Sequence, residues 1–268
     1  MHIDGSVAIV TGAGGGIGAA LVKELVVRGA RVVATDLDPD ALAAAVPAAD
    51  AVRTLPGDAS STNDIRAAID VAEREFGPVD LYAANAGVLR GFEPDVKPTD
   101  WDLSWQVNVM AHVRAAELLL PGWLERGNGH FLSTASAAGL LTQLGSPTYS
   151  VTKHAAVAYA EWLAATYGDR GVGVTCLCPM GVDTAMVRDG LASDDPVVQA
   201  GTAAVTSAGD VLSPKVVARE AIQGVIDGGF LVLPHPEVGT YRERKAADID
   251  RWIAGMQRYR RDLEGRAG

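Results

Sequence analysis

The sequence predicts an α/β protein built on a doubly wound parallel sheet of about seven strands with helices on both faces. Short apolar runs rich in β-branched residues alternate with stretches of helical periodicity over residues 5–235. Strands that alternate with helices are typical of a parallel sheet, because each crossover helix returns the chain to the end of the sheet at which the previous strand began. The 268 residues suffice for one large domain of this kind or for two small ones.

The expected elements follow one another without a long linker or an internal repeat. Strands are expected at residues 7–12, 30–36, 52–56, 79–87, 129–136, 172–179 and 230–234. Helices are expected after the first strand up to residue 29, and at 39–46, 62–77, 98–126 and 149–167. Either Thr62 or Asn63 is the expected N-cap of the third helix.

This pattern assigns residues 1–236 to a single domain, within which residues 185–212 form a loop or helical insertion. Residues 237–268 are expected to be a C-terminal helical extension, with one extra helix over 238–263. From Gly239 onward the chain carries eight Lys or Arg against five Asp or Glu. We interpret this locally basic segment as a solvated helix rather than as a binding arm.

The composition is that of an ordinary soluble globular protein, with 48% hydrophobic and 21% charged residues. The formal net charge of −10 argues against nucleic acid as a partner. No apolar run approaches the roughly 18 residues of a membrane span, and the N-terminus lacks the basic region of a signal peptide. We therefore expect a cytoplasmic protein without a membrane partner.

Cys176 and Cys178 are the only cysteines. Two residues apart on a strand, they face the same side of the sheet. A bridge across one intervening residue would be strained, and no further cysteine is present to complete a cysteine-rich metal site. Buried free thiols are expected, and no metal.

A glycine-rich segment, TGAGGGIG at Thr11–Gly18, lies directly between the first strand and the first helix. Gly12, Gly16 and Gly18 allow a tight turn and a close approach of the backbone to a ligand. The helix that follows presents free N–H groups and the positive end of its dipole, which suit a pyrophosphate. A merely flexible turn is the alternative, and the strand–turn–helix context favours a dinucleotide site.

Asp36 ends the second strand, 18 residues after Gly18. A carboxylate at this place accepts hydrogen bonds from the hydroxyls of an adenosine ribose and repels a 2′-phosphate. No Lys or Arg lies at residues 35–40 to accommodate such a phosphate. The sequence therefore favours NAD over NADP, and an Asp that only initiates a turn is the alternative.

Two Tyr–Lys pairs with a spacing of four residues compete as the candidate base. On a helix each pair lies on one face, and an ammonium beside a phenol lowers the pKa of the phenol. The pair Tyr149–Lys153 lies in the helix expected after the fifth strand, whereas Tyr241–Lys245 lies in the basic C-terminal segment. The spacing alone does not decide between them.

The motifs together resemble those of the short-chain dehydrogenase/reductase family, in its compact single-domain branch with a Rossmann-type fold, over about residues 5–235. TGAGGGIG matches the family's TGxxxGxG, and Asn85–Gly87 matches its NAG motif at the end of the fourth strand. The resemblance also carries a set of catalytic residues over to this chain, namely Asn108, Ser136, Tyr149 and Lys153.

The serine decides between the two Tyr–Lys pairs. Ser136 precedes Tyr149 by 13 residues, as the family usually has. Tyr241 has no serine motif at that distance upstream and no core strand after it, so its pair is expected on an exposed helix.

The resemblance implies the reversible oxidation of an alcohol to a carbonyl compound. The Tyr149 phenolate is expected to take the hydroxyl proton while a hydride passes to the nicotinamide. Lys153 is expected to lower the pKa of Tyr149 and to contact the nicotinamide ribose. Ser136 is expected to orient the substrate oxygen, and Asn108 to hold a water that relays protons.

The same resemblance implies the contacts to the cofactor. Asp58 is expected at the adenine amino group, with a cap or turn residue as the alternative, and Asn85 is expected to brace the sheet beside the cofactor. Val182 and Thr184 are expected to hold the nicotinamide carboxamide. The full set is Gly12, Gly16, Ile17, Gly18, Asp36, Leu37, Asp58, Ala59, Asn85, Ala86, Gly87, Tyr149, Lys153, Pro179, Val182 and Thr184.

One position departs from the family pattern. The usual Pro-Gly step after the sixth strand reads Pro179-Met180 here, with Gly181 one place later. Met180 puts the local backbone shape in doubt, and leaves the cofactor expectation as it is.

The substrate pocket is expected to be mainly apolar. The segments 87–92, 139–144 and the insertion from residue 185 supply Leu89, Phe92, Leu141, Leu144, Met186 and Leu191, with Gln143 and Arg90 as polar groups. We assign Leu89, Gln143, Leu144 and Met186 to substrate contacts. A medium-sized, mostly apolar secondary alcohol or ketone is expected.

Two alternatives stay open at this stage. One is an enzyme that works as a carbonyl reductase, and the other is a nucleotide-binding scaffold without activity. The long helices at 99–126 and 149–167 are the expected contact surfaces of a homodimer or homotetramer.

Overall fold

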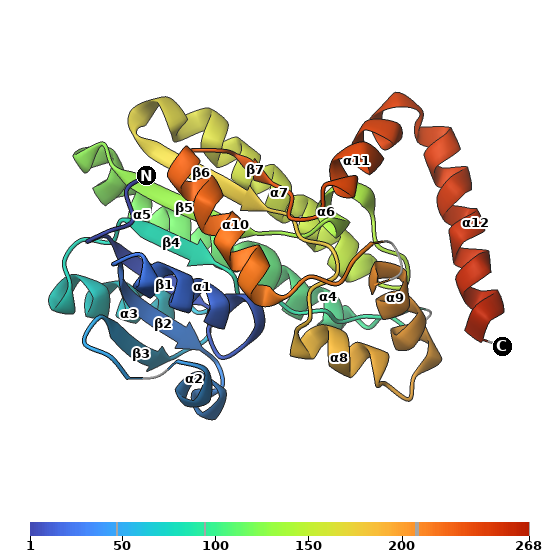
Figure 1. The fold of residues 1–268 in the computed structure, drawn as a ribbon, viewed down its shortest axis with the longest axis horizontal. Coiled ribbons are helices and arrows are strands. Elements are labelled where there is room, and N and C mark those ends of the chain that lie inside the picture. Colours follow the sequence, from blue (N-terminus) through green and yellow to red (C-terminus); the bar gives the residue numbers. More distant parts are fainter. Residues whose placement is uncertain (47, 94, 207–208, 268) are drawn as a thin grey trace.

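The computed structural model describes residues 1–46, 48–93, 95–206 and 209–267 (Figure 1). Within these residues, seven parallel strands form one sheet in the order β3-β2-β1-β4-β5-β6-β7. The strands are β1 (Val7–Thr11), β2 (Arg31–Asp36), β3 (Val52–Pro56), β4 (Leu81–Ala84), β5 (Gly129–Thr134), β6 (Val172–Leu177) and β7 (Leu231–Val232). The predicted parallel α/β architecture is confirmed.

The helices lie on both faces of the sheet and beyond its carboxyl edge (Figure 1). Those of the first half are α1 (Gly16–Val27), α2 (Pro39–Ala45), α3 (Thr62–Glu75), α4 (Pro98–Trp105), the π-helical turn η1 (Gln106–Met110) and α5 (Ala111–Arg126). Those of the second half are α6 (Ala138–Leu141), α7 (Pro147–Tyr167), η2 (Gly168–Arg170), α8 (Ala185–Leu191), α9 (Pro196–Thr206), α10 (Pro214–Asp227), α11 (Glu237–Ala247) and α12 (Ile249–Ala267).

Strand β1 shows how the sheet is buried on both sides. All five of its residues are buried, and successive side chains enter opposite layers of the core. Ala8 and Val10 pack with α1 and α10 on one face, whereas Val7 and Ile9 pack with α3, α5 and α7 on the other. An uninterrupted apolar run is what a strand covered on both faces requires.

The strand order indicates where a ligand would bind, namely at the carboxyl ends of β1 and β4. The chain runs outward from β1 through β2 to β3, and then returns to the other side of β1 to begin β4. At such a reversal the two crossover connections diverge and leave a crevice at the carboxyl ends of the strands. The residues after β1 and β4 are the glycine-rich turn and the NAG segment.

Several elements differ in detail from those expected. The side chain of Ser61, and not Thr62 or Asn63, caps α3 by accepting a hydrogen bond from the N–H of Asp64 at 3.3 Å. No element was predicted for α6 or α10. The insertion at 185–212 contains two helices, α8 and α9.

The prediction of a single helix over 238–263 is wrong, because the segment forms two helices. Asp248 has an extended backbone (φ −155°, ψ 96°) that separates α11 from α12. Its carboxylate accepts a hydrogen bond from the N–H of Arg251 at 2.9 Å, as an N-cap does. The chain therefore turns at Asp248, and α12 runs back beside α9 (Figure 1).

The two cysteines lie as expected. Cys176 and Cys178 are both free and fully buried in the same layer of the core, with their sulfur atoms 3.8 Å apart. In the part of the chain that the structure describes, no helix combines the length and the apolar character needed to cross a bilayer.

Candidate active site

The glycine-rich turn joins β1 to α1. Gly12 and Gly16 have positive φ angles of 66° and 51°, a conformation that favours glycine. A Cβ atom on Gly18 would overlap the carbonyl oxygen of Gly12, so the turn and the helix close on each other only without a side chain there. Helix α1 begins without a side-chain cap and without an acidic residue in its first turn, which leaves its N–H groups available.

Asp36 lies against this turn at the end of β2. One carboxylate oxygen accepts a hydrogen bond from the N–H of Gly14 at 2.8 Å, and the other accepts one from Asp38 at 3.1 Å. The next residue, Leu37, is 74% exposed. The negative charge of Asp36 is thereby fixed beside the start of α1.

Thr11 and Asn85 tie the ends of β1 and β4 together. The amide of Asn85 donates to the carbonyl oxygen of Thr11 at 3.0 Å and to that of Gly12 at 3.4 Å. The Thr11 hydroxyl accepts hydrogen bonds from the N–H groups of Asn85 and Ala86, each at 3.0 Å. These bonds hold the crevice between the two strands in a fixed shape.

Asn108 lies in the π-helical turn η1, which interrupts the long helix expected over 98–126. Its side chain is completely buried. The Oδ1 atom accepts a hydrogen bond from the N–H of Val88, and the Nδ2 atom donates one to the carbonyl oxygen of the same residue, each at 2.9 Å. The same amide donates to the hydroxyl of Thr152 at 3.1 Å. Asn108 thus links the loop after β4 to α7, and π-helical turns occur frequently at functional sites.

Helix α7 carries the first Tyr–Lys pair. Ser146 caps the helix and Pro147 occupies its first position, so the helix begins two residues before Tyr149. Lys153 lies one turn further on, with its Nζ atom 5.6 Å from the centre of the Tyr149 ring. The predicted arrangement of the two side chains on one helical face is confirmed.

Lys153 is a buried cation. Its side chain is 3% exposed, and the Nζ atom donates a hydrogen bond to the carbonyl oxygen of Thr134 at 3.0 Å. Burial lowers the pKa of Lys153 to about 8, because the charged form loses its hydration. Lys153 therefore titrates close to neutral pH.

The pKa of Tyr149 differs from the expectation. Burial of its hydroxyl raises the pKa above the ordinary value, while a hydrogen bond with Ser136 acts in the opposite direction. Lys153 was expected to lower the pKa of Tyr149, but in the protein without cofactor the effect of burial is larger. The Lys153 ammonium donates to the carbonyl oxygen of Thr134 and not to the Tyr149 hydroxyl.

Ser136 follows β5 and is 8% exposed. Its Oγ atom accepts a hydrogen bond from the N–H of Ala138 at 3.1 Å and donates one to the carbonyl oxygen of Pro179 at 3.5 Å.

Met180, which departs from the family pattern, has an ordinary backbone conformation. Among the described residues other than glycine, only Thr142 has a positive φ, so Met180 needs no left-handed backbone.

A cleft of about 280 Å³ brings most of the predicted cofactor residues together at the carboxyl edge of β1, β4 and β5. Tyr149, Lys153 and Ser136 all line it. So do Gly12, Gly16, Ile17, Asn85, Ala86, Gly87, Pro179, Val182 and Thr184, with Leu89, Gln143 and Met186 from the predicted substrate set.

The remaining predicted residues lie elsewhere. Asp36 ends β2 and Leu37 follows it, and neither lines the cleft. Asp58 and Ala59 lie beside a separate small pocket, where Asp58 accepts hydrogen bonds from the N–H and hydroxyl of Ser60, each at 2.8 Å. Asp58 therefore forms a turn, and its role at the adenine stays a prediction.

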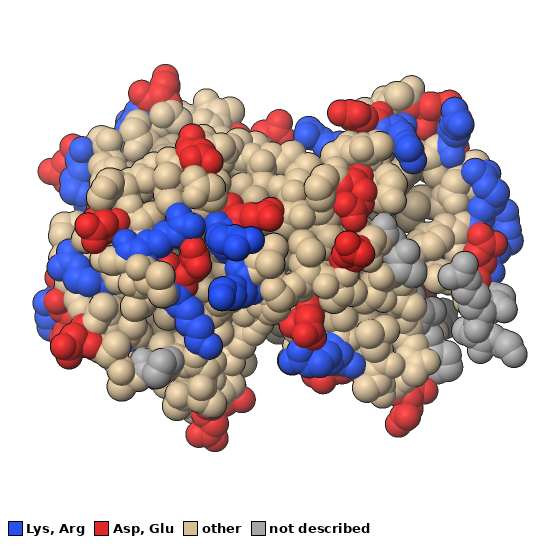
Figure 2. Space-filling model, viewed as in Figure 1, with Lys and Arg blue, Asp and Glu red and all other residues tan. Residues whose placement is uncertain are grey.

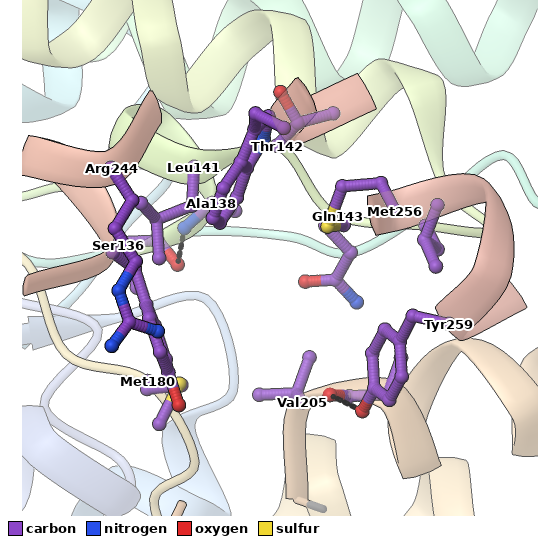
Figure 3. Close-up of a pocket in the computed structure, with 15 residues that line it drawn as sticks. Ser136, Ala138, Leu141, Thr142, Gln143, Met180, Val205, Arg244, Met256 and Tyr259 are labelled. Carbon is purple, nitrogen blue, oxygen red and sulfur yellow. Dashed lines mark hydrogen bonds between the residues drawn. The ribbon is translucent and has the colours of Figure 1, made fainter. Parts of the chain in front are cut away.

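A second cavity, of about 380 Å³, adjoins the cleft, and we call it the chamber. The two share a wall made of Ser136, Gln143, Met180 and Val205. The chamber contains the predicted Leu141 and Leu144, together with residues of α9, α11 and α12 (Figure 3). Arg90 and Phe92 line a third, open pocket instead, and the predicted Leu191 is 45% exposed.

The C-terminal segment is not the solvated helix that was expected. Tyr241, Trp252, Met256 and Tyr259 line the chamber. Lys245, expected on an exposed helix, donates a hydrogen bond to the carbonyl oxygen of Leu140 at 2.8 Å. The spacing of Trp252, Met256 and Tyr259 at i, i+4 and i+7 was the available sequence signal for a buried face of α12.

The cleft has the properties that a dinucleotide requires. The N-terminus of α1 is uncapped, and a Cβ atom on Gly15 would meet nothing within 4 Å, so there is space beside the turn. Thr134 lines the cleft, and its buried hydroxyl has no hydrogen-bond partner among the described residues.

Comparisons with known proteins agree with this geometry. The family model for short chain dehydrogenases matches residues 6–194. The chain is 38% identical over 200 residues to a 1-deoxy-11-beta-hydroxypentalenate dehydrogenase of Streptomyces exfoliatus, covering 70% of this chain and 71% of the relative. It is 32% identical over 209 residues to Short chain aldehyde dehydrogenase 1 of Euphorbia lathyris, covering 75% and 73%.

Among solved structures, a short chain dehydrogenase/reductase from Burkholderia phymatum in complex with NAD superposes with a TM-score of 0.83 at 30% identity, covering 93% of this chain and 96% of that one. A parallel sheet with a dinucleotide-type turn and a Ser–Tyr–Lys group at its carboxyl edge defines a class of nicotinamide-dependent oxidoreductases. This chain belongs to the short-chain dehydrogenase/reductase family.

Proposed function

We propose that this protein is an NAD-dependent dehydrogenase/reductase that interconverts a secondary alcohol and a ketone. The observation that carries the proposal is the meeting of Ser136, Tyr149 and Lys153 on one cleft, at the opening to a larger apolar chamber. Two relatives from Streptomyces are named as dehydrogenases of 1-deoxy-11-beta-hydroxypentalenate, a compound with a hydroxyl group. Oxidation of a hydroxyl is the reaction proposed for this chain.

The protein's own groups handle the proton and the developing charge. Tyr149 removes the hydroxyl proton of the alcohol during oxidation and returns it during reduction. Ser136 holds the substrate oxygen through its hydroxyl and stabilises negative charge there. NAD, when bound, would supply the acceptor for the hydride of the carbinol carbon, and its positive charge would favour the phenolate form of Tyr149.

Lys153 connects Tyr149 to solvent. With a pKa of about 8 its ammonium both donates and recovers a proton near neutral pH. Asn108 positions the loop after β4 and α7 around this lysine through its bonds to Val88 and Thr152. We place the relay water of the family beside Asn108.

Five groups of residues along the cleft and its margin would each hold one part of the dinucleotide. Gly12, Gly16, Ile17 and Gly18 receive the pyrophosphate at the start of α1. Asp36 and Leu37 face the adenosine ribose, and Asp58 and Ala59 the adenine. Asn85, Ala86 and Gly87 lie along the middle of the molecule, and Pro179, Val182 and Thr184 hold the carboxamide end.

The preference for NAD rests on Asp36. Its carboxylate is anchored by the N–H of Gly14, so it cannot swing away from a 2′-phosphate without losing that hydrogen bond. A fixed negative charge at this position repels NADP.

The test is the absorbance of reduced nicotinamide in the presence of the purified protein, NAD and a panel of apolar secondary alcohols. Tyr149→Phe is expected to lower kcat by about 10²- to 10⁴-fold, because the proton acceptor is gone while the cleft keeps its shape. NAD binding, followed by calorimetry, is expected to stay within about threefold, which separates loss of chemistry from loss of the site.

Three outcomes would count against parts of the proposal. Faster turnover with NADP than with NAD contradicts the role of Asp36. Unchanged turnover in Tyr149→Phe contradicts the proton transfer. Tight NAD binding without turnover of any alcohol or ketone in the panel favours the nucleotide-binding scaffold, and turnover with NADH and ketones alone favours a reductase.

A further inference from the structure

The chamber has two walls of different origin. The inner wall, towards the cleft, contains Ser136, Gln143 and Met180. Helices α11 and α12 supply the outer wall with five residues, Tyr241, Arg244, Trp252, Met256 and Tyr259. Because the family model matches residues 6–194, the outer wall lies outside the part of the chain that the family pattern explains.

The lining of the chamber is apolar apart from a few groups. Among the lining residues that the structure describes, Arg244 alone is charged, and none is acidic. Trp252, Met256 and Tyr259 are half-buried. Trp252 packs against Tyr241 of α11, and the Tyr259 hydroxyl donates to the carbonyl oxygen of Ala204 on α9 at 2.9 Å. Figure 3 shows Arg244 on the same side of the chamber as Ser136 and Met180.

The guanidinium of Arg244 has no carboxylate partner among the described residues. Its one aromatic neighbour is Tyr241, with the ring centre 5.9 Å from the guanidinium carbon. Arg188, by contrast, is satisfied by an ion pair with Asp183 at 2.6 Å. An arginine held over an aromatic ring at the edge of an apolar cavity presents a planar fork of donors that suits a carboxylate.

The surroundings favour the same ligand. The molecule has a formal charge of −10, but residues 239–268 carry eight basic and five acidic side chains. Figure 2 shows Lys and Arg side chains gathered over α11 and α12 on the face in view. An anion that approaches the chamber from this face therefore meets a locally basic surface.

We propose that the substrate of this enzyme carries a carboxylate, and that Arg244 is the specificity-determining residue that binds it. The apolar body of the substrate fills the chamber, its carbinol carbon lies at Ser136 and Tyr149, and its carboxylate lies at Arg244. This inference rests on the proposed function for the position of the carbinol, and it adds an apolar hydroxy acid or keto acid as the substrate class.

The experiment measures binding, so that it does not depend on turnover. The full-length protein, saturated with NAD, is titrated by calorimetry with adamantane-1-carboxylate and with adamantane-1-carboxamide, which share the apolar body and differ in charge. The carboxylate is expected to bind about five- to tenfold more tightly, as one charge-assisted contact at the cavity edge provides. Arg244→Gln is expected to abolish that preference.

Arg242→Gln is the matched control, because Arg242 is exposed on the same helix and does not line the chamber. It is expected to keep the preference for the carboxylate. Equal affinities for the two probes in the unaltered protein, the same preference in Arg244→Gln, or no binding of either probe would each overturn the inference. Failure to bind NAD would instead contradict the proposed function.

Discussion

At the scale of single residues, Lys153 shows how burial changes acid–base behaviour. Its pKa is about 8 in the folded protein and about 10.4 in an unfolded chain, so the unfolded state binds more protons between these values. Stability therefore rises with pH through this window, and below pH 8 the folded protein carries the full cost of a buried ammonium.

We predict that Lys153→Met removes this rise. From pH about 8 to pH about 9.5, the free energy of unfolding of the unaltered protein is expected to rise by about 1.5 kcal/mol relative to that of the variant. The comparison with the variant is needed because the raised pKa of the buried Cys176 thiol lowers the stability of both proteins over the same range. Urea unfolding at both pH values, followed by circular dichroism, is the measurement. Lys245, whose pKa is also lowered by burial, leaves a small rise in both proteins.

The same pH dependence in the variant as in the unaltered protein would show that Lys153 is hydrated. The window stops short of the region above pH about 10, where the raised pKa of Tyr149 makes stability fall with pH.

The positions of the candidate catalytic residues could be predicted from spacing, but their electrostatics could not. The separation of Ser136 and Tyr149 and the turn between Tyr149 and Lys153 are local properties of the sequence. The direction of the Tyr149 pKa depends on how deeply its hydroxyl is buried and on where the Lys153 ammonium points. The Lys153 ammonium points to the carbonyl oxygen of Thr134, which lies 19 residues earlier in the chain.

At the scale of elements, the turn between β1 and α1 depends on glycine for a steric reason. A Cβ atom on Gly18 would overlap the carbonyl oxygen of Gly12 and lie 2.7 Å from the Asn85 amide. Gly18→Ala is expected to lower the free energy of unfolding by about 1–3 kcal/mol, because the helix must move away from the turn.

Gly15→Ala is the control for this change, since a Cβ atom there meets nothing within 4 Å and the backbone is extended. Its loss of stability is expected to stay below about 1 kcal/mol. Equal losses in the two variants, measured by urea unfolding, would show that backbone entropy rather than overlap explains the glycine at position 18.

The tail shows where prediction at the scale of elements failed. Its charges indicated a solvated helix, whereas its break at Asp248 depends on a cap and its burial depends on α9, which is distant in sequence. The hydrogen bond from Lys245 to the carbonyl of Leu140 joins segments 105 residues apart. A local pattern does not contain such a contact.

At the scale of the whole molecule, the neighbouring helices α4 and α7 expose large apolar side chains. Leu103, Trp105, Val151 and Trp162 are each more than 40% exposed. Clustered exposed apolar residues mark protein–protein contact surfaces. We therefore expect these helices to form the interface of a homo-oligomer.

Trp162→Glu is predicted to shift the protein to the monomer, because a carboxylate in an apolar interface loses its hydration without a partner. Sedimentation velocity measures the result directly. Val27→Glu, at a residue that is 83% exposed on α1, is the control and should leave the assembly unchanged. A monomer before any substitution would rule out the interface.

The separate origin of the chamber's two walls has a consequence for how such enzymes diverge. The groups proposed to move the proton follow β5 or lie on α7, whereas the outer wall is made by residues of α11 and α12 between 241 and 259. If the chamber holds the substrate as proposed, a substitution on α11 or α12 is expected to alter which molecule binds and to leave Ser136, Tyr149 and Lys153 in place. Related proteins can therefore evolve toward new substrates by substitutions in one short segment, while the candidate catalytic residues stay unchanged.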